Sequence, residues 1–279
     1  MRIGVRAHDF GKLPADELAC RIAAKGLSCV QLAVSKAIAG LDLKPGDMNP
    51  GLAWHVGQAF QRHGVQIAVL GCYINPIHPD PQRRAELLGF FKEHIRFARD
   101  FGCNSVGLET GSVNADYSPH PNNHGELAFH RMLKSIAVLV EEAEKFGVIV
   151  CIEGVTSHTV STPAKMRRVL DTIKSNNLQV IFDPVNLLSI DNYRDQDRVM
   201  MESFDLFGDR IAVLHAKDFR VEGNALKQVR AGQGNYNYRL LLETINKRKP
   251  CISILLEEAS EDTAAECVQF INSMTAQSN

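Results

Sequence analysis

The amino-acid sequence repeats one arrangement, in which a helical segment ends at glycine and a short apolar run rich in β-branched residues follows. Glycine takes this place before CVQLA, QIAVLGCY, NSVGLET, VIVCIEG and RIAVLHAKD, as Gly26, Gly64, Gly102, Gly147 and Gly208. Glycine suits the left-handed position just past a helix, because it has no Cβ to clash there. We expect Asn177 to take the same place before LQVIFD.

Two further apolar runs, RIGVRA near the start and CISILLEE after Pro250, bring the number of expected strands to eight. Their nearly unbroken apolar character is typical of parallel strands that are covered on both faces. Helical patterns separate them; the longest spans 124–146, and Thr162 with Pro163 indicates a capped helix start. Eight alternating units in 279 residues predict an α/β fold, a single (β/α)8 TIM barrel. Without an obvious linker, we expect one domain over residues 1–279.

Charge and composition narrow the class of partner. The formal net charge is -1, which gives no electrostatic basis for binding nucleic acid or an anionic membrane surface. The apolar runs are far shorter than a membrane span, and the N-terminal residues lack an apolar signal region. We therefore expect a cytoplasmic protein with no nucleic-acid or membrane partner. The seven cysteines contain no CxxC pair, and we expect free thiols, buried at positions 29, 72, 151 and 251.

Polar residues stand at one depth near the ends of the expected strands. Glu109, Glu153, Asp183, His215 and Glu257 each lie six or seven positions after the preceding helix stop. The helix stops align at one end of a barrel, so these side chains are expected near the other end, where TIM barrels build their active sites. The last four come from consecutive strands and can face a common point.

Three carboxylates and an imidazole are costly to bring together without a compensating cation. Glu153, Asp183, His215 and Glu257 are therefore predicted to bind one divalent metal ion. Ligation mainly by oxygen with one nitrogen suits Mn2+ first, with Co2+, Mg2+, Zn2+ and Fe2+ as alternatives.

The phrases IEG (152–154), FDPVN (182–186), LHAKD (214–218) and LLEE (255–258) resemble the xylose isomerase-like barrel superfamily of sugar isomerases and epimerases. The resemblance covers essentially the whole chain. Among the members of the superfamily, the chain is similar to ketose 3-epimerases and inosose dehydratase. It implies that Glu153 and Glu257 bind metal and also transfer a proton through a metal-stabilised enediolate, with Asp183 and His215 mainly as ligands. The chain departs from the epimerases at Asn186, where they usually carry histidine.

Six residues are candidates for contact with substrate. The resemblance implies such contacts for Asn186 and for the segment after His215, and the remaining positions lie near the expected barrel mouth. Each also has a structural interpretation as a loop hydrogen bond or salt bridge. The candidates are His8, Glu109, His158, Asn186, Lys217 and Arg220.

The resemblance favours a metal-dependent sugar isomerase or epimerase that acts on a ketose or related polyol-derived substrate. A lyase of the inosose dehydratase type could use the same site and remains the main alternative. The superfamily also contains the AP endonuclease IV group, but the additional histidines of that group are missing here. A non-catalytic sugar-binding protein is the last alternative. The expected partner is a small carbohydrate, and a homo-oligomer remains open.

Overall fold

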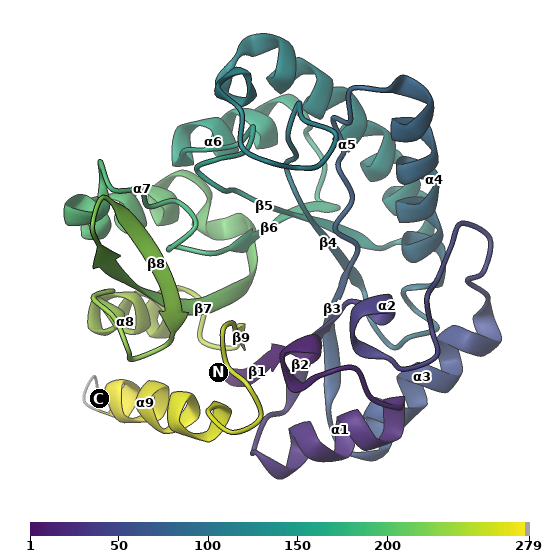
Figure 1. The fold of residues 1–279 in the computed structure, drawn as a ribbon, viewed down its shortest axis with the longest axis horizontal. Helices are drawn as coiled ribbons and strands as arrows, with labels where there is room; N and C mark the ends of the chain where they lie inside the picture. Colours follow the sequence, from purple (N-terminus) through teal and green to yellow (C-terminus); the bar gives the residue numbers. More distant parts are fainter. Residues whose placement is uncertain (277–279) are drawn as a thin grey trace.

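The recurring apolar runs form parallel strands that close into a barrel, with helices around its outside (Figure 1). The computed structural model describes residues 1–276. The barrel strands are β1 (Arg2–Arg6), β2 (Cys29–Leu32), β3 (Gln66–Gly71), β4 (Ser105–Glu109), β5 (Ile149–Glu153), β6 (Leu178–Phe182), β7 (Ile211–Glu222) and β9 (Ser253–Leu256). Neighbours pair in parallel around the ring, and β9 pairs with both β7 and β1, which closes it. The predicted TIM barrel is confirmed.

Helices follow most strands and cover their outer faces, as Figure 1 shows. They are α1 (Ala15–Ala24), α2 (Val34–Ala37), α3 (Pro50–Arg62), α4 (Pro81–Phe97), α5 (Glu126–Phe146), α6 (Pro163–Thr172), α7 (Gln196–Phe207), α8 (Tyr238–Arg248) and α9 (Ala264–Ala276). Short 3-10 turns are η1 (Ala7–Phe10), η2 (Pro121–His124), η3 (Tyr193–Asp195) and η4 (Gly208–Arg210). None of the helices in residues 1–276 is long and apolar enough to cross a membrane.

Most of the expected helix stops are confirmed. Gly26, Gly64, Gly102 and Gly147 all have positive φ, between 60° and 77°. Gly208 is different, with φ of -56°, because it starts the turn η4. The prediction for Asn177 is also wrong, since Asn177 has no positive φ; its amide side chain instead donates a 2.7 Å hydrogen bond to the Val148 carbonyl.

The strand register sets the height of the polar residues. Glu109 pairs directly with Glu153 across β4 and β5, and His215 of β7 lies opposite Leu255 of β9. Because parallel strands keep this register around the barrel, their C-terminal ends meet at one mouth. The predicted common depth is confirmed.

The seventh strand is much longer than its apolar run predicts. Beyond the barrel, its residues Lys217–Glu222 pair in antiparallel fashion with an additional strand, β8 (Ala225–Arg230). This hairpin stands beside the barrel opening in Figure 1. A loop interpretation of Lys217 and Arg220 is therefore wrong, because both lie on a strand whose charged residues interrupt the apolar pattern, although Phe219 between them is buried.

The barrel interior and the layer beneath the helices are apolar, and the buried thiols belong to this core. Cys29, Cys72 and Cys151 are buried as expected, and all seven cysteines are free. Cys251 is exposed, because β9 begins only at Ser253.

A buried histidine on α4 should make the fold sensitive to acid. Burial lowers the pKa of His94 to about 4, and its Nδ1 lies 3.0 Å from the Phe90 carbonyl. The unfolded chain would bind a proton there at about pH 6.5, so stability present above that pH is lost as pH falls towards 4. Between pH 7 and pH 5 the wild type should lose about 2 kcal/mol more of its unfolding free energy than His94→Gln. Urea denaturation at the two pH values measures this, with exposed His55→Gln as control. Equal losses in wild type and His94→Gln would contradict it.

Candidate metal centre

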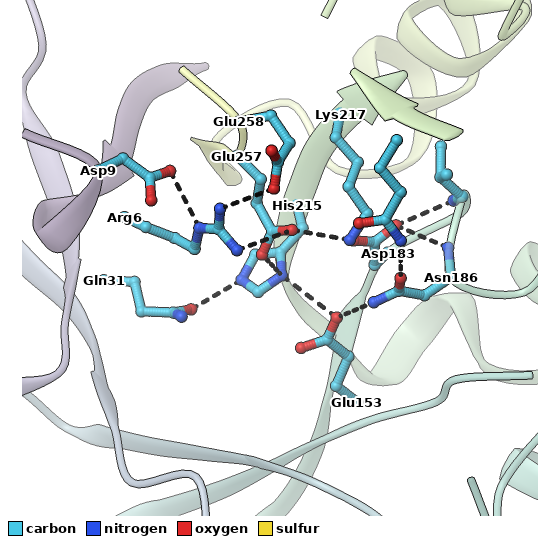
Figure 2. A network of polar contacts seen from close by, with 12 residues as sticks. Arg6, Asp9, Gln31, Glu153, Asp183, Asn186, His215, Lys217, Glu257 and Glu258 are labelled. Carbon is cyan, nitrogen blue, oxygen red and sulfur yellow. Dashed lines mark hydrogen bonds and ion pairs between the residues drawn. The ribbon is translucent and has the colours of Figure 1, made fainter. Parts of the chain in front are cut away.

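Four side chains from consecutive barrel strands converge at the mouth (Figure 2). Glu153 ends β5, Asp183 directly follows β6, His215 lies within β7 and Glu257 directly follows β9. All four are buried, and each offers one ligand atom, the four atoms lying within 4.8 Å of one another. The sequence therefore identified the members of a cluster with the geometry of a single cation site.

The orientation of His215 is set on both sides of its ring, as Figure 2 shows. Its Nε2 lies 2.8 Å from Oε1 of Gln31, a carbonyl oxygen that can only accept, so Nε2 carries a hydrogen. Its Nδ1 lies 3.4 Å from Oε1 of Glu153 and 3.0 Å from Oε1 of Glu257. Nδ1 is therefore the nitrogen available to a metal.

The Asp183 carboxylate is held in a similar way. Its Oδ1 accepts hydrogen bonds from the backbone N–H groups of Val185 and Asn186, at 2.9 and 3.0 Å. Its Oδ2 is buried and makes no hydrogen bond within residues 1–276, although Nζ of Lys217 lies 2.9 Å away as an ion-pair partner. Nδ1 of His215 is likewise buried without a hydrogen bond. Two buried polar atoms without hydrogen bonds, together with two carboxylates, fit the donor set of one divalent cation.

Cationic side chains offset part of the negative charge. Nζ of Lys217 donates to Oε2 of Glu257 at 2.8 Å, and a guanidinium nitrogen of Arg6 lies 3.4 Å from the same oxygen. Burial would raise the pKa of Glu257, but Lys217 and His215 outweigh burial and hold that pKa well below its usual value. Burial lowers the pKa of His215, but the carboxylates of Glu153 and Glu257 outweigh it and raise that pKa to about 10. At Asp183 burial prevails over Lys217, and the pKa is raised.

Asn186 and the β7–β8 hairpin fix the position of Glu153. Nδ2 of Asn186 donates to Oε1 of Glu153 at 2.7 Å, and Nε2 of Gln228 on β8 donates to Oδ1 of Asn186 at 3.1 Å. The asparagine that departs from the epimerase pattern is thus a direct partner of the cluster.

The cluster opens into a cavity of about 330 Å³ at the barrel mouth. Of the residues expected to contact substrate, His8, Glu109, His158, Asn186 and Lys217 line it. Arg220 does not line it; it lies exposed on the outer part of β7, where its guanidinium donates to the Gln233 carbonyl. A larger hollow of about 520 Å³ lies beside α3, but it contains none of the four cluster residues.

Sequence reasoning missed five polar residues of the cavity wall: Arg6, Gln31, Lys36, Tyr73 and Gln228. Arg6 and Tyr73 could have been found, because they stand at the ends of β1 and β3. Gln31 is a single polar residue in the apolar run CVQLA, and that position was the available clue. Gln228 belongs to the hairpin that the pattern did not reveal.

The segment after β9 has an unusual backbone. Glu258 has φ of 57°, a left-handed conformation that costs a side-chain-bearing residue about 1–2 kcal/mol. Its Oε1 lies 3.2 Å from Arg6, which also pairs with Asp9 at 3.0 Å and with Glu257. The turn at Glu258 is therefore held by the same guanidinium that contacts the cluster (Figure 2).

Glu109 and His158 form a second pair in the cavity, with Oε2 and Nδ1 3.3 Å apart. Burial lowers the pKa of His158 to about 4, so its imidazole is neutral at pH 7. Burial, followed by the charges of Glu153 and Glu257, raises the pKa of Glu109 to about 8. Without a cation, Glu109 is thus largely protonated at neutral pH.

Metal binding should displace a proton from His215. With its pKa near 10, the imidazole is charged at neutral pH, whereas a metal ligand must be neutral. Titrating Mn2+ or Co2+ into chelator-treated protein should release about one proton per cation at pH 7, and affinity should rise with pH. Calorimetry in two buffers of different ionisation enthalpy measures the proton. Heats that do not depend on the buffer would argue against His215 as a ligand.

Comparison with known proteins assigns the chain to a family. A family model described as a xylose isomerase-like TIM barrel matches residues 19–274. No curated protein sequence matches the chain. Among solved structures, a D-tagatose 3-epimerase-like protein is 17% identical, with a TM-score of 0.79 over 100% of this chain and 98% of that one.

Two other solved structures are similar to this chain, at comparably low sequence identity. D-psicose 3-epimerase with D-tagatose, from Clostridium cellulolyticum H10, is 13% identical, with a TM-score of 0.75 over 99% of both chains. The IOLI protein with a binding zinc atom is 15% identical, with a TM-score of 0.70 over 100% of this chain and 98% of that one. At such identities the structural likeness establishes the fold, while the family model covers most of the sequence. The chain belongs to the xylose isomerase-like TIM barrel family.

Proposed function

We propose that the chain is a metal-dependent sugar isomerase or epimerase, acting on a ketose or related polyol-derived substrate, with Glu153 and Glu257 as the acid/base pair. The observation that carries the proposal is the position of these two carboxylates, on either side of His215 in one cavity. The ketose epimerases among the similar structures give the proposal its substrate class.

We assign the metal ligands as Glu153, Asp183, His215 and Glu257, because these four side chains offer a buried donor set within 4.8 Å of one another. When bound, a divalent cation would polarise the carbonyl and hydroxyl oxygens of a sugar and stabilise negative charge that develops on them. Mn2+ is our first candidate, because oxygen donors predominate.

The two proposed acid/base residues are prepared differently. Glu257 is kept ionised by Lys217 and His215, so it is suited to remove a proton from the carbon next to a carbonyl. Glu153 accepts a hydrogen bond from Asn186 at Oε1 and lies across the cluster from Glu257. A proton taken on one face of an enediolate can then be returned from the other, which inverts the carbon.

We assign substrate contacts to the cavity residues His8, Glu109, His158, Asn186 and Lys217. The imidazoles of His8 and His158 are both neutral at pH 7, because burial lowers each pKa to about 4. Neutral imidazoles can donate and accept, which suits sugar hydroxyls. Arg220 is left out of this set, because its guanidinium lies at Gln233 outside the cavity.

A lyase at the same site is the second candidate, and Glu109 favours it. A carboxyl group on the cavity wall, with a pKa raised first of all by burial, could donate the proton that a departing hydroxyl requires. Proton NMR of the product separates the two reactions, since only dehydration removes an oxygen from the substrate.

The metal assignment predicts that Asp183→Ala loses the cation. Purified wild type should contain close to one divalent ion per chain by elemental analysis, and Asp183→Ala almost none. Asp191→Ala, an exposed carboxylate after β6, is the matched control and should keep the metal. If wild type holds no metal even after incubation with Mn2+ or Co2+, the proposal fails.

The acid/base assignment predicts large losses of turnover on replacing either glutamate. With a ketose identified from a panel of ketoses, ketose phosphates and inososes, Glu153→Gln and Glu257→Gln should each lower kcat by about 100-fold or more. Both should also suppress uptake of solvent deuterium at the reacting carbon. Metal content is measured alongside, so that loss of the cation is separated from loss of the proton-transfer group. Glu261→Gln is the control, and full activity of Glu257→Gln would refute the assignment.

A further inference from the structure

The cavity contains one cation that no carboxylate neutralises within residues 1–276. Arg6, Lys36 and Lys217 line the cavity. Arg6 pairs with Asp9, Glu257 and Glu258, and Lys217 pairs with Asp183 and Glu257. Lys36, on α2 after β2, forms no salt bridge in the described part of the chain, and it is an exposed residue that contributes to the cavity wall.

The position of Lys36 relative to the cluster follows from a series of contacts. Its Nζ lies over the Tyr73 ring, 5.7 Å from the centroid. The Tyr73 hydroxyl accepts a 2.7 Å hydrogen bond from Gln31, whose Oε1 is 2.8 Å from Nε2 of His215. Lys36 is therefore separated from the candidate metal centre by Tyr73 and Gln31, along one wall of the same cavity.

His8 adds a second polar group to this wall. It lines the cavity, and its Nδ1 is buried with no hydrogen-bond partner among residues 1–276. Lys36 and Arg6 are close enough to His8 to contribute, after burial, to its lowered pKa. A buried nitrogen without a partner and an unpaired ammonium group that line the same cavity are the arrangement expected where a ligand supplies the missing acceptor.

We propose that the substrate carries an anionic group, a carboxylate or a phosphate ester, which binds Lys36 with His8 beside it. This inference rests on the proposed function, because it places the reacting carbons at the metal centre and the anionic group at the other end of the cavity. Negative charge would be repelled near Glu153 and Glu257, so the Lys36 wall is where the cavity can accept it.

Three sugars that differ only at one end test the charge requirement. D-fructose, D-fructose 6-phosphate and D-fructuronate carry a hydroxyl, a phosphate and a carboxylate at the same carbon. Calorimetry with metal-loaded protein should show tighter binding of at least one anionic sugar than of fructose. Whether the phosphate or the carboxylate binds more tightly identifies the source of the anion.

Lys36→Gln should weaken binding of that anionic sugar by about 10- to 100-fold, the size expected for a charged hydrogen bond. Binding of fructose should be nearly unchanged, and Lys36→Arg should retain most of the anion preference. Lys25→Gln, at the end of α1 and outside the cavity, makes the same charge change as a control.

The inference is wrong if wild type shows no preference for either anionic sugar, or if Lys36→Gln weakens all three ligands equally. Inorganic phosphate and acetate are titrated as well. If no sugar binds and neither anion binds in a Lys36-dependent manner, the inference is also wrong. An anion preference that depends on Lys36, in a protein that turns over no sugar of the panel, would refute the proposed function and leave this inference standing.

Discussion

Three buried carboxylates meet at the mouth of the barrel, and the surrounding structure is arranged around their mutual repulsion. An unpaired buried carboxylate costs several kcal/mol, and three at one point cannot all remain ionised without positive charge nearby. Lys217 and His215 supply this charge inside the cluster, and Arg6 supplies it from the edge. The distribution of positive charge is clearest at Glu257, where Oε1 faces His215 and Oε2 faces Lys217 and Arg6. One oxygen is thus oriented by fixed cations while the other remains directed at the point where a metal would bind.

Part of this arrangement can be read from the sequence, because it follows from barrel geometry. A strand that starts at a helix stop and runs six or seven residues ends at the mouth, so Glu153, Asp183, His215 and Glu257 could be placed at one height by counting. The same reasoning does not require that the helix stop be left-handed. Gly208 starts a 3-10 turn instead, yet the count to His215 still holds, since strand length and not the conformation of the stop determines the depth.

Other parts were hidden for physical reasons. The β7–β8 hairpin extends beyond the barrel, and charged residues interrupt its few apolar positions, such as Phe219 and Leu226, so its sequence resembles a polar loop. Gln31 sits in a buried strand, where a polar side chain has a role only through its partner, and the partner, His215, is 184 residues away. Arg220 was expected in the cavity because it follows His215 closely, but the hairpin carries it outward to Gln233. A contact between distant strands produces no hydrophobic pattern in one sequence. Neither does a hairpin whose apolar positions are interrupted by charged residues.

The cavity has two chemically different halves. The carboxylates all come from β4 onwards, whereas the first three strand units contribute only cationic and uncharged groups: Arg6, His8, Gln31, Lys36 and Tyr73. The motifs that resemble the family all lie in the carboxylate half, from residue 152 onwards. Family membership therefore accounts for the metal-binding half of the site. What distinguishes one substrate from another must then lie largely in the first three units and in the hairpin, where Lys36, Tyr73 and Gln228 form the rest of the wall. A ketose spanning the cavity would present its reacting carbons to the carboxylate half and its remaining substituents to the half built by the first three strand units. The chemistry and the choice of substrate can therefore vary independently in this barrel.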